Sequence, residues 1–221
     1  MNFVKKKKKF FSLFDKMKFS FFPCFYFVSF LPRSQIKHNL LSIYENSHYP
    51  IEKNTKYESM EHIIPKSFMI DKQNRNEMHN IILIPTKLNN ARANFKFVDE
   101  IPENVPTTTL NEFGEVTKKR TNTSSVKCKQ LQIFSPAEEY RGMIARAILF
   151  FVFYYVNESQ PIIFDKVIDK ETVLKWNQDY PPTPFEYYKN KCIQKLQGND
   201  NIFISYYNQS KSNYALHKMN K

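Results

Sequence analysis

Three residues have side chains that could act together on a phosphate ester: Glu61, His62 and, further along the chain, Asn89. Carboxylate and amide oxygens are hard ligands that suit Mg²⁺, which keeps several water molecules when it binds a protein. A bound divalent cation can neutralise a phosphate oxygen and the leaving 3′-oxygen. A neutral histidine can take a proton from water near neutral pH. The three residues therefore predict phosphodiester hydrolysis, with Glu61 and Asn89 on the metal and His62 as general base.

Two polar residues between them, His79 and Asn80, could support the same site. We expect Asn80 to hydrogen-bond to loop backbone and to hold the strand that carries His62. His79 competes with His62 as ligand or base, although its position also suits a core histidine. A glutamate–histidine pair beside apolar residues is more often a surface pair without a role. The prediction therefore depends on Asn80 and Asn89 both occurring at a compatible spacing.

Other catalytic groups have little support in the sequence. No cysteine lies near this cluster, and no GxSxG turn is present to carry a serine nucleophile. The cysteines, Cys24, Cys128 and Cys192, do not have the spacing of metal ligands. A disulfide between Cys128 and Cys192 and free thiols in a reducing compartment fit equally well.

For the site residues to meet, the chain must form two strands and a helix. The sequence predicts a strand in YESMEHIIPKSF (57–68), ended by Pro65. It predicts a buried strand in MHNIILIP (78–85) and the start of a helix in TKLNNARANFKF (86–97), with Thr86 as its cap. A hairpin with the helix packed across it can bring the site residues to one point.

The glutamate and the histidine are neighbours, which restricts how they can share a site. Adjacent residues in a regular strand point to opposite faces of the sheet. Glu61 and His62 can therefore both reach the site only if the strand is bulged or ends there. Pro65 and the irregular segment 66–77 are compatible with either arrangement.

The rest of the chain is predicted to be mainly helical. Segment 36–47 has the apolar spacing of a short amphipathic helix. Segment 135–158 is the strongest helix of the chain, with Ser135 as its cap and an apolar middle. Residues 99–125, which contain two prolines and many threonines, are expected to form a loop or insertion.

Two further helices are expected in 169–204, separated by a break at 180–184. The second should end near Gly198, because glycine readily adopts the left-handed conformation that ends helices. Arg146 lies inside the apolar helix that precedes them, and we expect it to form an ion pair with a carboxylate.

The formal charge of the chain is +12, which favours a polyanionic partner such as nucleic acid. Residues 1–33 contain seven lysines and Arg33 against Asp15 alone, so more than half of this charge lies there. The rest of the chain is only modestly basic. Charge alone is therefore a weak argument for binding nucleic acid.

The N-terminal residues combine a lysine run with the apolar stretch 19–31, which is too short for a confident membrane span. A signal peptide, an uncleaved anchor and an unstructured extension all fit. We therefore expect a basic and apolar extension (1–33), a folded domain (34–208) and a polar tail (209–221). The location stays open, with a secreted or membrane-anchored protein slightly favoured over an intracellular one.

Four sequence blocks, in this order, resemble the bacterial endonuclease I family, non-specific nucleases of the ββα-metal (His-Me finger) group. MEHIIP resembles the family's WEHVVP, with Met60 replacing the aromatic residue. EMHNIILIPTKLNNARANF resembles DMHNLxPxxxxxNGxRxNF. SPAEEYRGMIAR resembles P…RGxIAR, and Trp176 followed by YPPTPFE and LQGNDNIFI resembles the fourth block. Together the blocks cover roughly residues 57–204.

The resemblance implies the roles that the chemistry suggested, with Glu61 and Asn89 as metal ligands and His62 as base. It also draws attention to two residues that match the family pattern near Asn89. Arg92 is the better candidate for a contact to substrate phosphate, and Asn94 would support the loop.

The chain departs from the family pattern in the segment 66–77, which is short. Many relatives carry an insert at this point, with cysteines and a phosphate-binding arginine. Arg75 or Lys72 could take over that contact, although no motif marks them.

We therefore expect an α+β fold, a mainly helical domain around a ββα-metal core. The expected activity is metal-dependent hydrolysis of DNA with little sequence preference, and RNA stays open as a second substrate. The expected cofactor is Mg²⁺ or another divalent cation such as Mn²⁺ or Ca²⁺, with no organic cofactor. A monomer would bind the phosphate backbone. A catalytically inactive nucleic-acid-binding relative and a membrane-anchored interaction protein remain as alternatives.

Overall fold

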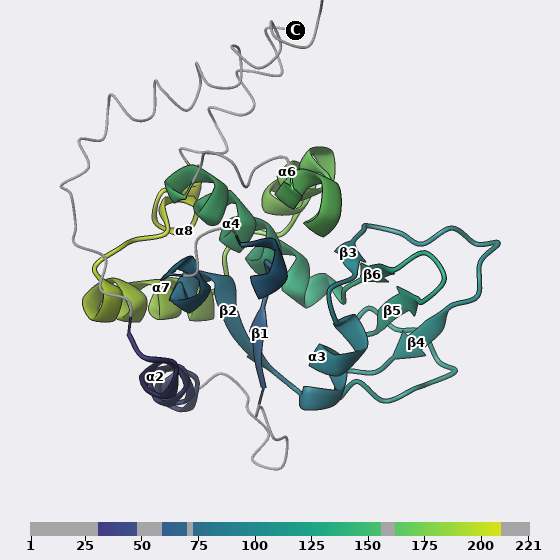
Figure 1. Cartoon of the computed structure of the whole chain (residues 1–221), viewed down its shortest axis with the longest axis horizontal. Coiled ribbons are helices and arrows are strands. Elements are labelled where there is room, and N and C mark those ends of the chain that lie inside the picture. Colours follow the sequence, from purple (N-terminus) through teal and green to yellow (C-terminus); the bar gives the residue numbers. More distant parts are fainter. Residues whose placement is uncertain (1–30, 48–58, 70–72, 156–161, 209–221) are drawn as a thin grey trace, which may run out of the picture.

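A computed structural model describes residues 31–47, 59–69, 73–155 and 162–208 of the chain. Within them, helices and two small sheets occur together, which confirms the α+β class (Figure 1). A two-stranded hairpin lies between a group of helices on one side and a four-stranded sheet on the other. The expected polar tail and most of the expected N-terminal extension lie outside the described residues. No helix in the described part of the chain is long and apolar enough to span a membrane.

The hairpin consists of β1 (Ser59–His62) and β2 (Ile81–Ile84), which pair antiparallel in unbroken register. Helix α3 (Thr86–Arg92) follows β2 directly. The predicted order of strand, irregular segment, strand and helix is therefore confirmed. Thr86 is not a cap, however, because Pro85 precedes the helix and no side chain caps it. The segment between the strands contains three short helical turns: η1 (Lys66–Phe68), η2 (Gln73–Asn76) and η3 (Met78–Asn80).

Strand β2 is buried on both faces, because the hairpin lies between two hydrophobic clusters. Ile82 and Ile84 belong to the larger cluster, which also contains Leu88 of α3. Ile81 and Leu83 belong to the smaller cluster, together with the apolar side of α2 (Arg33–Asn46). A slip of one residue would exchange these two sets of side chains, so the burial fixes the register.

The expected helix near the N-terminus of the domain is confirmed as α2. Arg33, which the sequence analysis assigned to the extension, is the first residue of this helix. The hydroxyl of Tyr44 accepts a hydrogen bond from the backbone N–H of Leu83 at 3.2 Å, which ties α2 to β2. Helix α2 is therefore a fixed part of the folded structure.

The larger cluster surrounds α4 (Glu138–Tyr154), in which every residue from Ile144 to Val152 is buried. The prediction of a central core helix is confirmed, but the prediction of Ser135 as its cap is wrong. Ser135 is the last residue of a strand, and its hydroxyl donates a hydrogen bond to the backbone oxygen of Asp99 at 2.8 Å. Ala137 precedes the helix without a capping side chain.

The four-stranded sheet was not foreseen, because residues 99–125 were expected to form a loop. Its strands have the spatial order β3–β6–β5–β4, and β3 pairs parallel with β6. Each strand is too short to show a clear alternation of apolar and polar residues. The strands are β3 (Lys96–Phe97), β4 (Thr108–Leu110), β5 (Ser125–Cys128) and β6 (Ile133–Ser135).

The two helices predicted in 169–204 are confirmed as α6 (Lys170–Asp179) and α7 (Pro184–Gln197). Thr183 and Glu186 form a capping box at the start of α7, and Gly198 ends it with a φ of 90°. The structure also contains the short helices η4 (Ile163–Val167) and α8 (Ile202–Ser205). Cys128 and Cys192 are both free thiols.

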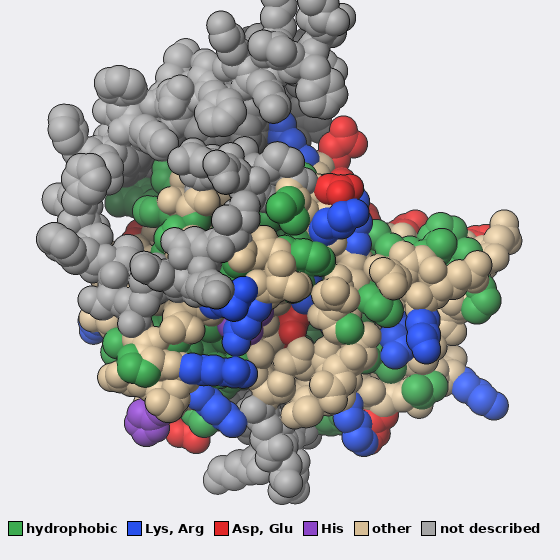
Figure 2. Space-filling view, viewed as in Figure 1, with side chains coloured by type: hydrophobic (Ala, Val, Ile, Leu, Met, Phe, Trp, Pro, Cys, Tyr) green, Lys and Arg blue, Asp and Glu red, His purple; other side chains and the backbone are tan. Residues whose placement is uncertain are grey.

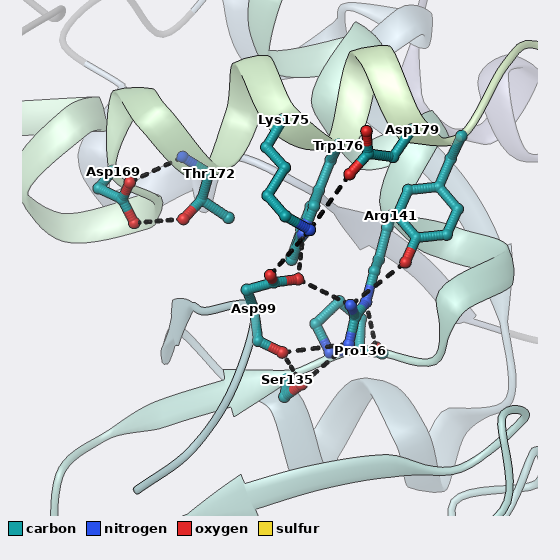
Figure 3. Close-up of polar contacts among 10 residues, drawn as sticks. Asp99, Ser135, Pro136, Arg141, Asp169, Thr172, Lys175, Trp176 and Asp179 are labelled. Carbon is teal, nitrogen blue, oxygen red and sulfur yellow. Dashed lines mark hydrogen bonds and ion pairs between the residues drawn. The ribbon is translucent and has the colours of Figure 1, made fainter.

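A polar cluster around Asp99 joins the sheet to two helices (Figure 3). One carboxylate oxygen of Asp99 accepts hydrogen bonds from Arg141 at 2.7 Å and from the indole of Trp176 at 2.8 Å. The other oxygen lies 3.0 Å from the ammonium nitrogen of Lys175. These contacts fix α4 and α6 relative to the segment that follows β3.

The expected ion pair of Arg146 is confirmed, and its partner is Glu186 of α7. The two guanidinium–carboxylate contacts measure 2.8 and 2.7 Å, and both side chains are almost fully buried. Such a pair joins α4 to α7. Removing one partner of a buried pair leaves an uncompensated charge in the core.

We predict that Glu186→Gln lowers the free energy of unfolding by about 3–5 kcal/mol, because it leaves the Arg146 charge buried without a counter-charge. Urea unfolding followed by circular dichroism measures this loss. Glu115→Gln is the matched control, since Glu115 pairs with Lys87 on the exposed surface and should change stability far less. Equal losses in the two variants would contradict the structural role of the buried pair.

Candidate active site

Glu61 points from β1 into the side of the hairpin that faces α3. Its side chain is buried, and one guanidinium nitrogen of Arg92 lies 2.9 Å from its oxygen Oε1. The contact is an ion pair, although its angles are not those of a well-aligned hydrogen bond. Burial raises the pKa of Glu61 to about 7, although the charge of Arg92 acts in the opposite direction. The carboxylate is therefore only partly compensated by its protein surroundings.

Asn89 lies on the same side of the hairpin as Glu61. Its amide nitrogen donates a hydrogen bond of 2.6 Å to the hydroxyl of Ser59. Ser59 and Glu61 are two residues apart on β1 and therefore share a face of the strand. The structure thus brings the two predicted metal ligands to one side of the hairpin, between β1 and α3.

His62 leaves β1 on the opposite face, because the strand is regular up to this residue. No bulge is present in the pairing of β1 with β2, and His62 is the last residue of its strand. The strand therefore ends at His62 without a bulge, and the side chains of Glu61 and His62 leave it on opposite faces. His62 pairs with Ile81 in the register and faces the side of the hairpin on which α2 packs.

The ring of His62 is held by a backbone carbonyl. Its Nε2 atom lies 3.1 Å from the backbone oxygen of Arg75. A carbonyl oxygen can only accept, so Nε2 must carry the hydrogen, and Nδ1 of the neutral ring is left as acceptor. Burial lowers the pKa of His62 to about 4, and the charges of Lys66 and Arg33 act in the same direction. The imidazole is therefore neutral at pH 7.

Arg92 is not placed where the sequence analysis expected it. Its side chain is only 3% exposed, which contradicts a direct contact to substrate phosphate. Besides Glu61, it donates to the backbone oxygens of His62 at 3.3 Å and of Ile63 at 2.7 Å. Arg92 follows Asn89 by three residues in α3, so both side chains lie on the same inward face of the helix. The spacing in the sequence could therefore have shown that Arg92 points inward.

Asn80 lies at the point where the segment between the strands enters β2. Its side-chain oxygen accepts from the backbone N–H of Ile64 at 2.8 Å, and its amide nitrogen donates to the backbone oxygen of Ile64 at 3.1 Å. Both residues are almost fully buried. One side chain therefore satisfies both backbone groups of the residue two positions after His62.

The side chain of His79 lies in the core and that of Asn94 lies at the surface. The His79 ring is buried against Phe150, with ring centres 4.4 Å apart, and its Nε2 lies 3.3 Å from the backbone oxygen of Asn199. Burial lowers its pKa. Of the two possibilities left open for His79, the core position is the one observed. Asn94 is exposed beyond the end of α3.

Two cations near His62, Lys66 and Arg33, were not singled out from the sequence. They belong to η1 and α2, and Arg33 had been assigned to the extension. No local motif could have revealed them, because only the packing of α2 against the hairpin brings Arg33 near His62.

The residues around Glu61 fit a divalent cation. Within the described part of the chain, no group of three His, Cys, Asp or Glu side chains could hold a metal ion. The predicted ligand set is smaller, with one carboxylate and one amide, and such sets suit Mg²⁺ with several waters. Arg92 offsets the burial of Glu61 only in part, since the pKa of Glu61 still rises to about 7, and a cation would compensate the rest.

We predict that Asn80→Ala lowers the free energy of unfolding by about 2 kcal/mol, because the N–H and C=O groups of Ile64 are left buried without partners. Thermal unfolding measures the change. Asn94→Ala is the control, because Asn94 is exposed and should have little effect. Unchanged stability of Asn80→Ala would show that water replaces the amide at no cost.

Comparison with known proteins identifies the family of the chain. The Endonuclease I family model matches residues 31–207. An extracellular deoxyribonuclease of Aeromonas hydrophila is 32% identical over 136 residues, covering 61% of this chain and 51% of that protein. A periplasmic deoxyribonuclease of the same organism is 29% identical over 58% of this chain and 46% of its own length. Endonuclease-1 of Buchnera aphidicola is 25% identical, with coverage of 58% and 45%.

The chain thus spans about half the length of the curated relatives it matches. The family model, by contrast, extends from the start of α2 to the end of the described C-terminal helices. It includes the hairpin, α3 and every predicted site residue. On this evidence the chain belongs to the endonuclease I family.

Proposed function

We propose that this protein is a divalent-metal-dependent endonuclease that hydrolyses DNA with little sequence preference. The observation that carries the proposal is the arrangement at the end of β1. An under-compensated buried carboxylate, Glu61, lies on one side of the strand with Asn89. A neutral histidine, held by the Arg75 carbonyl, lies at the strand end on the other side. The names of the Aeromonas relatives as deoxyribonucleases support DNA as the substrate.

In this proposal β1, β2 and α3 form the ββα-metal (His-Me finger) core. Glu61 and Asn89 would hold Mg²⁺, Mn²⁺ or Ca²⁺ through their side-chain oxygens. When bound, the cation would stabilise negative charge on the phosphate and on the leaving 3′-oxygen. Arg92 would stay behind Glu61 as an internal counter-charge, and Asn80 would hold the backbone that follows His62.

His62 would act as the general base of the reaction. With Nε2 bonded to the Arg75 carbonyl, Nδ1 takes a proton from a water molecule as the water oxygen attacks phosphorus. The bond between phosphorus and the 3′-oxygen breaks, and the 3′-oxygen takes a proton from solvent water, which leaves a 5′-phosphate and a 3′-hydroxyl. The lowered pKa of His62 keeps the imidazole unprotonated at neutral pH.

The ion pair between Glu61 and Arg92 favours a second candidate function, an inactive relative that only binds nucleic acid. In such a protein Arg92 would neutralise Glu61 permanently and no cation would bind. The short segment 66–77 points the same way, because it lacks the insert that many relatives carry. Cleavage and metal-binding measurements distinguish the two candidates.

For the nuclease we predict that the full-length protein nicks supercoiled plasmid in Mg²⁺ and not in EDTA. His62→Ala should reduce the rate by about 10²–10⁴-fold, as expected for loss of a general base. His38→Ala, a change at an exposed histidine of α2, is the matched control and should keep full activity. A parallel assay on single-stranded RNA tests the second substrate. Nicking by His62→Ala at the wild-type rate would refute the assignment.

The metal site makes a prediction that does not depend on cleavage. Mn²⁺ at a hundredfold excess over its Kd should raise the free energy of unfolding by about 2.7 kcal/mol. Glu61→Gln should abolish this increment, because a neutral amide replaces the charged ligand. Each variant is compared with itself in EDTA, so that any loss of stability from unpairing Arg92 cancels. Glu115→Gln is the control, and an unchanged increment in Glu61→Gln would place the cation elsewhere.

A further inference from the structure

Lys189 is a lysine of α7 whose charge lies inside the molecule. Figure 2 shows exposed Lys and Arg side chains over the region between α2 and the hairpin, whereas Lys189 is only 6% exposed. Among the described residues, no carboxylate forms an ion pair with it. Burial lowers the pKa of Lys189 to about 8, although the charges of Glu186 and Glu77 act in the opposite direction. The chain therefore keeps a charge in its interior at neutral pH, which is unfavourable unless protein groups bind the ammonium.

The ammonium group of Lys189 binds the first residue of β2. Its nitrogen donates a hydrogen bond of 2.7 Å to the backbone oxygen of Ile81, a residue that is also buried. The N–H of Ile63 donates to the backbone oxygen of Asn80 at 3.0 Å. This bond identifies His62 and Ile81 as a non-hydrogen-bonded pair of the ladder, in which the backbone groups of each residue point away from the other strand. The carbonyl of Ile81 therefore needs a donor from outside the hairpin.

His62 lies directly opposite the residue that Lys189 holds. Ile81 is the partner of His62 in the register, and the Cα atoms of such a pair are only about 4.5 Å apart. Both side chains face the side of the hairpin on which α2 packs. A movement of the Ile81 backbone would therefore move His62 as well.

Two buried cations hold this end of the hairpin from opposite sides. Arg92 of α3 donates to the backbone oxygens of His62 and Ile63 at the end of β1. Lys189 of α7 donates to the backbone oxygen of Ile81 at the start of β2. Helices α3 and α7 lie on opposite sides of the hairpin (Figure 1). The backbone of both strands is thus fixed at the level of the histidine that is the proposed general base.

The outer edge of β2 has a second side-chain contact, further from the site. The backbone N–H of Leu83 donates to the hydroxyl of Tyr44 at 3.2 Å. Leu83 pairs with Met60, two residues before His62. A neutral hydroxyl satisfies the edge at that position, whereas at Ile81 the chain uses an ammonium group, whose hydrogen bonds are shorter and stronger. The stronger contact lies at the end of the hairpin that carries His62.

We propose that Lys189 is a positioning residue for His62. It holds the Ile81 carbonyl and thereby fixes the end of the hairpin from which the His62 ring reaches the substrate. Lys189 itself is buried and would not touch the substrate. What the His62 ring does in catalysis rests on the proposed function, whereas its placement by Lys189 rests on these contacts.

Lys189→Met is the variant that tests this role, because it keeps an apolar stem of similar length and removes the donor. Cleavage of a fluorogenic DNA duplex by the full-length protein in Mg²⁺ gives kcat and KM separately. We expect kcat to fall by about 10- to 100-fold, since displacing a catalytic group by about 1 Å has effects of this size. KM should stay unchanged, because the lost interaction does not involve bound DNA. Lys189→Arg should recover most of the rate, because a guanidinium also donates and a cavity of about 20 Å³ beside Lys189 leaves room for it.

Two controls separate positioning from a loss of charge or of stability. Lys191→Met makes the same change at an exposed lysine of α7 and should leave kcat unchanged. Tyr44→Phe leaves the buried N–H of Leu83 without its acceptor, so it should lower the melting temperature and leave kcat unchanged. If Lys189→Met does not fold, Lys189→Gln replaces it, because that side chain is uncharged and one bond shorter. A kcat for Lys189→Met equal to that of either control would overturn the proposal.

A second measurement does not depend on cleavage. The NMR signals of the His62 ring are identified by their loss in His62→Ala and are compared in EDTA between the wild type and Lys189→Met. A displaced ring should shift these signals, whereas Lys191→Met should leave them unchanged. Shifted signals, with no nicking by the wild type in Mg²⁺, would support the positioning role and refute the nuclease. Unchanged His62 signals in Lys189→Met would refute the positioning role whatever the cleavage assay shows.

Discussion

The burial of the β1–β2 hairpin on both faces is the constraint on which the rest of the site depends. Because each strand is packed on two sides, adjacent residues of β1 must enter different surroundings. Glu61 enters the side of α3 and the larger cluster, whereas His62 enters the side of α2. Because the strand ends at His62, this end is the only place where the side chains of Glu61 and His62 could act on one substrate. Any slip of register would exchange them.

The two sides of the hairpin meet different electrostatic demands. On the Glu61 side a buried carboxylate needs positive charge, and Arg92 supplies it incompletely, since the pKa of Glu61 still rises to about 7. Arg92 also donates to the carbonyl groups of His62 and Ile63. One buried arginine therefore satisfies the carbonyl groups at the end of the strand and also compensates part of the charge of the carboxylate. It contacts Oε1 of Glu61 at 2.9 Å, although the contact lacks the geometry of a well-aligned hydrogen bond.

The hairpin and α3 could be predicted because apolar runs bounded by Pro65 and Pro85 mark them in the sequence. The four-stranded sheet could not, because strands of two to four residues carry no readable periodicity. The predicted cap Ser135 was wrong for a tertiary reason, since its hydroxyl binds the distant Asp99 backbone. The sequence showed that Arg146 needed a carboxylate, but only the packing of α7 on α4 identifies Glu186 as its partner.

For the site residues too, some features could be predicted from the sequence and others depend on tertiary packing. The order of these residues along the hairpin and α3 could be predicted from their spacing in the sequence. The depth at which each side chain is buried could not. Arg92 and His79 are both polar residues in matching blocks, and both are buried in the structure. Depth depends on which elements pack on each face of the hairpin, and these elements are remote in sequence. The cations beside His62 were overlooked for the same reason.

The arginines show why family resemblance is a better guide to scaffold than to substrate contacts. Three arginines lie in the blocks that resemble the family, and each pairs with a carboxylate of the same chain. They are Arg92, Arg141 and Arg146. The cations that face His62 lie outside those blocks. A buried bidentate pair such as Arg146–Glu186 demands one side chain at one position, because both charges are desolvated. Attraction between a partly exposed cation and a phosphate tolerates changes of position, so different segments can supply it.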